Sequence, residues 1–262
     1  MDGENTTGLA KVEVIRVEET IPGHGAIGEA AVEYVPSERE FTIVVNGEVE
    51  TSLYCAPHRV KALVVGWLVC EGVVENDSDL LAIDTDLESL HVKVTIAEAA
   101  ASDLAVRALT GPVGRLSEPD FPRRVDTALE LTPEQVSSLS DSFKKLFLGL
   151  KSSERMCYLS AFAHNGEIQS YGEGFHRINA LYRALGELVI ARVAPKDRIV
   201  LTNFGLTQQM TLRLARAGVC MALTAAAPSS AAIELANQYY LCIVGTAVGG
   251  QITVYSAPWR VI

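Results

Sequence analysis

The sequence lacks any long apolar run, and it is poor in positive charge. Lys and Arg number 22 against 32 Asp and Glu, which gives a formal net charge of -10 and a pI near 5.0. Surfaces that bind nucleic acid or anionic membranes need clustered Lys and Arg, so this balance argues against both partners. No window reaches the roughly 18 apolar residues of a membrane span. Residues 1–10 also lack the apolar core of a signal peptide, so we expect a cytoplasmic protein.

Paired cysteines are absent as well. The chain has five cysteines, an odd number, and no two of them have the C-x-x-C spacing of a metal site. Most lie in apolar runs, as Cys220 does before Met221 and Ala222. This pattern predicts buried, reduced thiols of a cytosolic protein, with no disulfide framework and no metal held by side chains.

The composition is that of a globular protein, with 48% apolar and 21% charged residues. A chain of 262 residues can bury one large core or two small ones. Residues 111–124 contain three prolines and two glycines, which is typical of a loop that divides a chain. We therefore predict a disordered tail at 1–10, an N-terminal α+β domain at 11–110, a linker at 111–130 and an α/β domain at 131–262.

The first half is predicted to form a hairpin and one helix. Residues 41–45 and 48–54 read as strands, because Asn46 and Gly47 between them supply the positive φ angles of a tight turn. Pro57 is expected to open a helix that ends at Gly72, since the apolar residues between them recur at helical spacing. A further strand is expected at residues 90–96.

The second half alternates between strands and helices. Thr132, Pro133 and Gln135 form a helix start with a capping box. Strands are expected near 157–163, 167–171, 198–202, 219–224, 241–245 and 251–255, and helices near 132–148, 177–193, 206–217 and 229–239. This order predicts a largely parallel sheet that is covered on both faces.

In such sheets ligands bind at the carboxyl ends of the strands. That rule selects four loops, each rich in small or hydroxyl-bearing residues, over which backbone amides can approach a ligand closely. They are residues 172–177, 202–206, 224–230 and 245–250.

Several short motifs, read in order over residues 40–262, resemble the FdhD family of formate dehydrogenase accessory sulfurtransferases. The motifs that carry the resemblance are Val45-Asn46-Gly47, Ala56-Pro57, residues 63–68, Glu71-Gly72, residues 172–180 at the family's R-E-D-V-G-R-H-N-A, Ala226-Ala227-Pro228-Ser229 at its S-A-P-T, and Thr253-Val254-Tyr255 at its N-V-Y. Each match alone is weak, whereas their order and spacing together are specific.

The resemblance implies a sulfur relay. Family members accept sulfur as a persulfide from a cysteine desulfurase and pass it to the molybdenum cofactor, a bis-molybdopterin guanine dinucleotide, of formate dehydrogenase. It also implies a C-terminal three-layer domain similar to cytidine deaminase, which binds that cofactor or a guanine nucleotide. Formate dehydrogenase or another molybdenum enzyme is thus an expected partner, and a homodimer is one assembly to consider.

The sulfur-carrying cysteines of the family's C-G-x-C-G motif are replaced in this sequence. Thr110 and Val113 stand at the two cysteine positions, between which Gly111 remains. Because a persulfide needs a thiolate, neither residue can carry sulfur. Cys157 could be a relocated carrier; alternatively it is a buried thiol acting as a small hydrophobe. A member that only binds or chaperones the cofactor or its target enzyme is the competing hypothesis.

The resemblance also transfers a set of cofactor-binding residues. Arg177 and Asn179 could orient a phosphate or a guanine ring; alternatively Glu173 pairs with Arg177 and Asn179 caps a turn. The glycine pair near the C-terminus could admit a phosphate or could only form a turn. The full set is Glu173, Arg177, Asn179, Pro228, Thr246, Ala247, Val248, Gly249, Gly250 and Gln251.

Overall fold

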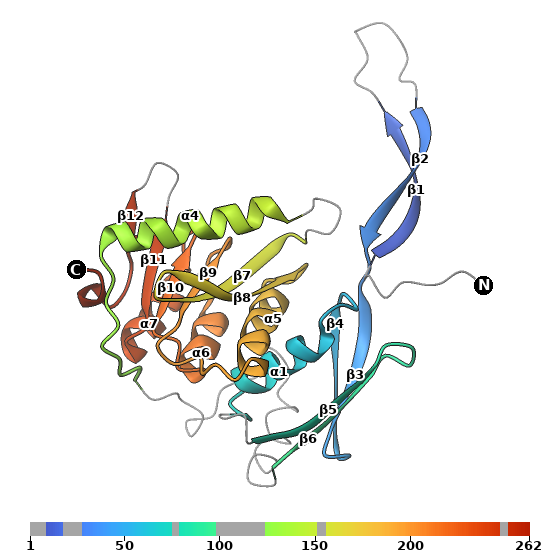
Figure 1. The fold of residues 1–262 in the computed structure, drawn as a ribbon, viewed down its shortest axis with the longest axis horizontal. Coiled ribbons are helices and arrows are strands. Elements are labelled where there is room, and N and C mark those ends of the chain that lie inside the picture. The colour runs from blue at the N-terminus through green and yellow to red at the C-terminus, as the bar shows by residue number, and fades with distance from the viewer. Residues whose placement is uncertain (1–8, 18–27, 75–78, 98–123, 151–155, 247–250) are drawn as a thin grey trace, which may run out of the picture.

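The computed structural model describes residues 9–17, 28–74, 79–97, 124–150, 156–246 and 251–262. Figure 1 shows a layered body with a two-stranded ribbon projecting from it. Within the described residues, no helix has the length and apolar character that a membrane crossing requires.

The larger sheet lies in the C-terminal half and has six strands in the order β12-β11-β10-β9-β7-β8. β9, β10 and β11 are parallel, whereas β7, β8 and β12 join through antiparallel pairs. The prediction of a largely parallel sheet is therefore wrong. The tight turn at Asn165 and Gly166 (φ 50° and 82°) makes β7 and β8 antiparallel, and β7 then pairs antiparallel with β9, which element order does not indicate. The strands are β7 (Tyr158–His164), β8 (Glu167–Gly174), β9 (Ile199–Thr202), β10 (Met221–Thr224), β11 (Cys242–Thr246) and β12 (Ile252–Val254).

Helices cover both faces of this sheet, as predicted. One face packs against α5 (Arg177–Ile190), α6 (Gln208–Arg216) and α7 (Ser230–Tyr239), and the other against α4 (Pro133–Gly149). Neighbouring strand residues alternate between the two cores: Phe162 and Val200 join the first, and Leu159 and Leu201 the second. The three-layer α/β arrangement is confirmed (Figure 1).

The start of α4 has the predicted cap. The Thr132 hydroxyl accepts a hydrogen bond from the backbone N–H of Gln135 (3.4 Å), and the Gln135 side chain accepts one from the Thr132 N–H (2.8 Å). Pro133 occupies the first helical position, where a missing N–H costs nothing. The local sequence alone therefore fixes where this helix begins.

The N-terminal half forms a smaller sheet in the order β4-β3-β6-β5. Its predicted turn is confirmed, since Asn46 and Gly47 have φ angles of 51° and 76°. The strands are β3 (Arg39–Val45), β4 (Val49–Cys55), β5 (Leu80–Asp86) and β6 (His91–Ile96). The ribbon consists of β1 (Leu9–Val17) and β2 (Gly28–Pro36), so the predicted disordered tail is wrong at its last two residues. Sequence periodicity did not predict β1, β2 or β5.

Helix α1 (Val60–Cys70) joins the two halves. It begins three residues after Pro57, because Arg59 before it adopts a left-handed conformation (φ 49°) that a helix cannot contain. α1 crosses α5 at Gly66 and Gly186, where a Cβ on Gly66 would lie 2.6 Å from the carbonyl carbon of Tyr182. Glycine at both positions therefore lets the two backbones touch. α1, β3 and helices α5 to α7 share one apolar core.

The described end of the predicted linker is held to the body. Val125 is buried, and the buried guanidinium of Arg260 donates to the carbonyls of Val125 (2.9 Å) and Thr127 (3.0 Å). Arg260 ends the short 3₁₀ helix η3 (Pro258–Arg260) near the C-terminus. The rest of the linker, residues 111–123, lies outside the described residues, as do Thr110 and Val113.

Candidate functional site

The strand register places the selected loops at one edge of the large sheet. Successive neighbours across the sheet are aligned at the ends of their strands, so the loops that follow β8, β9, β10 and β11 leave the sheet side by side. Because β7 is antiparallel to β9, its first residues lie at this edge too. The aligned pairs are Gly174 with Tyr158, Ser160 with Thr202, Thr202 with Thr224, and Thr224 with Gly245. The described ends of these strands therefore meet at one edge, and residues 247–250 of the last loop lie outside the described residues.

A row of hydroxyl groups crosses three strands just inside this edge. Ser160, Thr202 and Thr224 are buried and, by strand alternation, face the helices α5 to α7. The Thr202 hydroxyl donates to the Phe204 carbonyl (2.7 Å). The hydroxyls of Ser160 and Thr224 have no hydrogen-bond partner among the described residues. Since buried polar groups normally have partners, these two can bind a polar ligand group or water.

The loops after β9 and β10 are fixed to each other and to β7. The Asn203 side chain accepts from the Leu159 N–H (2.8 Å) and donates to the Cys157 carbonyl (3.1 Å). Gly205 packs so closely that a Cβ there would lie 2.9 Å from the carbonyl carbon of Ala227. Pro228, a predicted cofactor residue, lies half-buried in the second of these loops. These contacts hold the loops after β9 and β10 in fixed positions relative to each other and to β7.

Two helices also direct their N-termini toward this edge. Thr207 caps α6 by accepting from the Met210 N–H (3.4 Å), and Ser229 caps α7 by accepting from the Ala232 N–H (3.2 Å). The free N–H groups and the positive end of the dipole at a helix N-terminus favour an anion. Together with the hydroxyl row, they make the edge suitable for a phosphate-bearing ligand.

Arg177 lies at the same edge, in the first turn of α5. Its guanidinium stands over the Tyr158 ring, 5.4 Å from the ring centroid, and is exposed. Tyr158 in turn contacts Phe204 edge to face, with 5.6 Å between ring centroids. Packing against the Tyr158 ring, which Phe204 supports through its own contact, restricts the cation, which can thus meet a phosphate at low entropic cost. His176 before it is exposed and lies 3.4 Å from a carboxylate oxygen of Glu38.

Two other predicted cofactor residues face the N-terminal half. Asn179 is buried, and its amide donates to the Tyr54 carbonyl at 2.8 Å, so it ties α5 to β4. Glu173 is buried as well, and its carbonyl accepts from Arg183 at 2.5 Å. Arg183 also donates to the carbonyls of Ala56 (2.7 Å) and His58 (3.2 Å). The described contacts therefore join the two halves of the chain, which the sequence alone did not indicate.

Thr246 and Gln251, two of the last predicted cofactor residues, lie on the opposite face of the sheet. Thr246 and Gln251 line a cavity of about 190 Å³ against α4, together with Ser140 and Lys144. Ala247, Val248, Gly249 and Gly250 lie outside the described residues. Three cavities lined by described residues do not combine Arg177 with Pro228. A single cleft that holds the whole predicted set thus remains a prediction.

The five cysteines, all in the described part of the chain, differ sharply in exposure. Cys157 is exposed, so the alternative that it is a buried hydrophobe is wrong. The other four are buried, and burial raises the pKa of Cys55 to about 11, of Cys220 to about 11 and of Cys242 to about 12. Burial also raises the pKa of the Cys70 thiol. Cys157 precedes β7 and thus lies at the edge where the loops gather, next to Tyr158.

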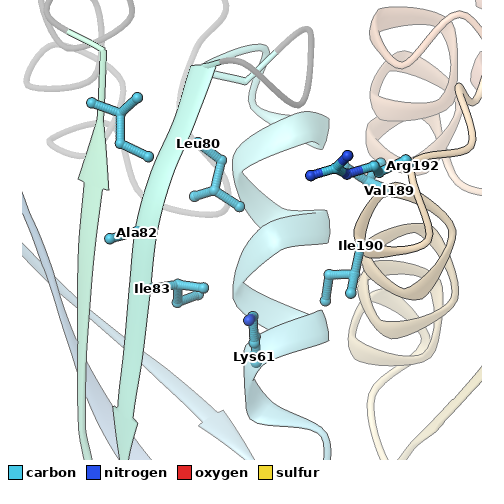
Figure 2. Close-up of a pocket in the computed structure, with 8 residues that line it drawn as sticks. Lys61, Leu80, Ala82, Ile83, Val189, Ile190 and Arg192 are labelled. Carbon is cyan, nitrogen blue, oxygen red and sulfur yellow. The ribbon is translucent and has the colours of Figure 1, made fainter.

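The remaining cavities lie away from this edge. One cavity of about 230 Å³ lies between β5, α1 and α5, and its lining includes Leu80, Ile83, Ile190, Lys61 and Arg192 (Figure 2). No group of three or more His, Cys, Asp or Glu able to hold a metal ion occurs among the described residues.

Two kinds of similarity bear on the identity of the chain. A crystal structure of a candidate formate dehydrogenase accessory protein from Desulfotalea psychrophila superposes with a TM-score of 0.72, at 20% identity over 97% of this chain and 99% of that one, which supports the fold. The "Sulfur carrier protein FdhD" of Bacillus pumilus is 25% identical over 87% of this chain and 90% of its own length. That of Staphylococcus haemolyticus is 26% identical over 95% of each chain.

The family model gives the decisive match. It extends over residues 36–262, which include both sheets of the body, α1 and all four ligand loops. The sequence motifs and the fold agree with it, although the cysteine positions of the motif loop are occupied by Thr110 and Val113. The chain belongs to the FdhD/NarQ family.

Proposed function

We propose that this chain is an accessory sulfur carrier for a molybdenum enzyme of the formate dehydrogenase type, and that Cys157 is the thiol that receives the sulfur. The observation that carries the proposal is that Cys157 is exposed at the edge of the large sheet where the four selected loops begin, while the other four cysteines are buried. Family membership and the names of the relatives support the activity. Five cysteines without a disulfide suit the reducing cytoplasm, which we propose as the site of action.

The loading step is a thiol–persulfide exchange. The Cys157 thiolate attacks the outer sulfur of a persulfide on the desulfurase cysteine, forming an S–S bond to Cys157 and breaking the one in the desulfurase. The desulfurase thiolate leaves with the electron pair of the broken bond, so no external oxidant is needed. Only an accessible thiol permits this approach, because each sulfur-carrying partner must reach it.

The molybdenum cofactor is the substrate that would accept the sulfur. The edge of the sheet has groups that could bind its phosphates. Arg177 can pair with a phosphate as a planar donor, and the capped N-termini of α6 and α7 supply further N–H groups. The hydroxyls of Ser160 and Thr224 can bind polar atoms inserted deeper. We infer that the guanine dinucleotide of a molybdopterin cofactor binds here, within reach of Cys157, and that the target enzyme docks at the same edge.

A mass measurement tests sulfur loading. Incubation with a cysteine desulfurase and cysteine should add about 32 Da, one sulfur atom, to the peptide that contains Cys157, because only this thiol is accessible. Cys157→Ser should abolish the adduct, whereas Cys55→Ala, which removes a buried thiol, should leave it unchanged. An unmodified wild-type protein, or an adduct on another cysteine, would refute the role of Cys157.

The loss of both motif cysteines favours a second function, namely binding the cofactor without carrying sulfur. This function requires the same edge but no thiol. Calorimetry with GDP as the probe should then detect binding that Arg177→Ala weakens about tenfold, the usual scale for one charge-assisted contact to a phosphate. Lys145→Ala, an exposed cation on α4, is the matched control and should bind as the wild type does. GDP binding without sulfur loading would select this second function. If neither GDP binding nor sulfur loading occurred, both functions would be excluded.

A further inference from the structure

The cavity between β5, α1 and α5 lies far from the edge where the four selected loops begin. It adjoins the last residues of α5, whereas Arg177 at the edge is the first residue of that helix, and the 14 residues of α5 span about 20 Å. Its volume of about 230 Å³ exceeds that of engineered core cavities that take up benzene, about 150 Å³. The cavity is therefore large enough for a small ligand, and the proposed sulfur transfer does not use it.

The described residues that line this cavity are either aliphatic or cationic. Leu80 and Val189 pack on the apolar core, and Ile190 is 40% exposed at the end of α5. The two charged residues are Lys61 and Arg192, although the chain as a whole has 32 acidic and 22 basic residues. None of the described lining side chains is a carboxylate that would repel an anion, and none is an aromatic ring on which a base could stack. Together these side chains favour a ligand with an aliphatic part and a negative charge.

Helix stability does not explain the position of Lys61. It is the second residue of α1, where the positive end of the helix dipole disfavours a cation. The first turn of α1 contains no acidic residue, and Lys61 is exposed without an ion pair in the described part of the chain. Figure 2 shows Lys61 on α1, with β5 on one side and Ile190 and Arg192 on the other. An anion at this place would be stabilised by the ammonium group and by the helix dipole together.

We propose that the cavity binds a linear aliphatic carboxylate of about eight carbons, with its carboxylate at Lys61 and its chain between β5 and α5. In Figure 2, Lys61 lies level with Ile83, and Arg192 lies level with Leu80. The path along β5 from Ile83 to Leu80 measures about 10 Å, which is close to the length of an extended chain of eight carbons, about 9 Å. A chain of this length would cover Leu80 and Ile190 and remove their apolar surface from water.

Calorimetry with the full chain and sodium octanoate as the probe tests the proposal. Octanoate should bind saturably to one site per chain. Hexanoate should bind about tenfold more weakly, because it lacks two methylene groups that each change the dissociation constant about fourfold when buried. Octan-1-ol has the same chain without the charge and should also bind about tenfold more weakly. No saturable binding of octanoate, or equal affinities for octanoate and octan-1-ol, would overturn the proposal.

Two variants locate the ligand in this cavity. Lys61→Met keeps the apolar stem of the side chain and removes its charge, so it should raise the dissociation constant for octanoate about tenfold and leave that for octan-1-ol unchanged. Ile190→Ala removes part of the apolar wall and should weaken the binding of both ligands alike. Lys145→Met on α4, also an exposed lysine, is the matched control and should bind octanoate as the wild type does. The proposal fails if Lys61→Met binds octanoate normally, or if Lys145→Met weakens binding as much.

Stability and competition measurements complete the test. The side chains of Lys61 and Ile190 are exposed, so both variants should melt at the temperature of the wild type, and either one alone locates the ligand. Saturating GDP should leave the affinity for octanoate unchanged, because the loop edge is about 20 Å away. Competition between the two would place octanoate at the loop edge and overturn the proposal. The proposal does not depend on sulfur transfer or cofactor binding, so its failure leaves the proposed function intact.

Discussion

Replacing Gly66 by alanine should loosen the joint between the two halves of the protein. A Cβ at this position would lie 2.6 Å from the carbonyl carbon and 2.9 Å from the Cα of Tyr182 on α5. A separation of about 0.8 Å would bring only the carbonyl carbon to the 3.4 Å of ordinary contact, and the helices would have to move further because the carbonyl oxygen of Tyr182 lies nearer still. Backbone atoms cannot change rotamer to make room, so the whole packed pair of helices must shift.

The cost can be bounded from two opposing effects. Overpacking costs about 1–3 kcal/mol, and a backbone clash belongs at the upper end of that range. Alanine also favours the helix by about 1 kcal/mol relative to glycine. We therefore expect the free energy of unfolding to fall by about 2 kcal/mol, and the melting temperature by roughly 4–8 °C in a chain of this size. Urea denaturation followed by circular dichroism measures the first quantity, and calorimetry the second.

Two further glycines make the test specific. Gly186→Ala should have a similar effect, because a Cβ there would lie 2.6 Å from the carbonyl carbon of Ala62 on α1. Gly149, the last residue of α4, has nothing within 4 Å of an added Cβ, and Gly149→Ala should be neutral or stabilising by up to about 1 kcal/mol. If Gly66→Ala were as stable as Gly149→Ala, the close crossing of α1 and α5 would be refuted.

Three more outcomes follow from the same structure. Burial and the neighbouring arginines lower the pKa of His58 to about 3, so an unfolded chain binds a proton between pH 6.5 and 3 that the folded chain does not. The free energy of unfolding should thus fall as the pH drops through this range, by at most about 1.4 kcal/mol per pH unit, and urea titrations should show a shallower fall in His58→Gln. Iodoacetamide should label Cys157 in the native protein and the buried Cys55 only after unfolding, as mass spectrometry would reveal. Thr132→Ala should destabilise the protein by about 1 kcal/mol in thermal denaturation, because α4 loses its capping box; an unchanged melting temperature would contradict this.

Local sequence signals predicted those parts of the fold that depend on local physics. The capping residues around Thr132 and the turn at Asn46 act within a few residues, and the structure has each of them as expected. The direction of the strands was mispredicted because pairing is a long-range property: β7 lies beside β9, more than thirty residues away, with β8 on its other side. The ribbon was missed because neither of its faces is buried, so its apolar residues do not separate from its polar ones by alternation.

The contrast between local and long-range effects also explains which parts of the candidate site could be predicted. The rule that ligands bind at the carboxyl ends of strands selected, from element order alone, loops whose strands end at one edge of the sheet. It could not select Ser160, because that residue reaches the edge only through the antiparallel course of β7. Nor could it separate Asn179, which binds the Tyr54 carbonyl, from Arg177 two residues earlier, which is exposed. Which side of a helix faces the ligand depends on what packs behind it, and that packing comes from the other half of the chain.

Cys157 is the cysteine that could take over the role of the two replaced motif cysteines, because the fold exposes it at the edge where the loops gather. A sulfur carrier needs a thiol that two successive partners can reach, and four of the five thiols are excluded by burial. The Asn203 side-chain amide donates a hydrogen bond to the Cys157 backbone carbonyl and accepts one from the Leu159 N–H in β7, so the sheet sets the place of Cys157 relative to the loops. A thiol on such a fixed element can serve only if the cofactor comes to it. Sulfur transfer by this chain would therefore depend on cofactor bound at the edge near Arg177, and Arg177→Ala should slow delivery from loaded Cys157 without preventing loading by the desulfurase.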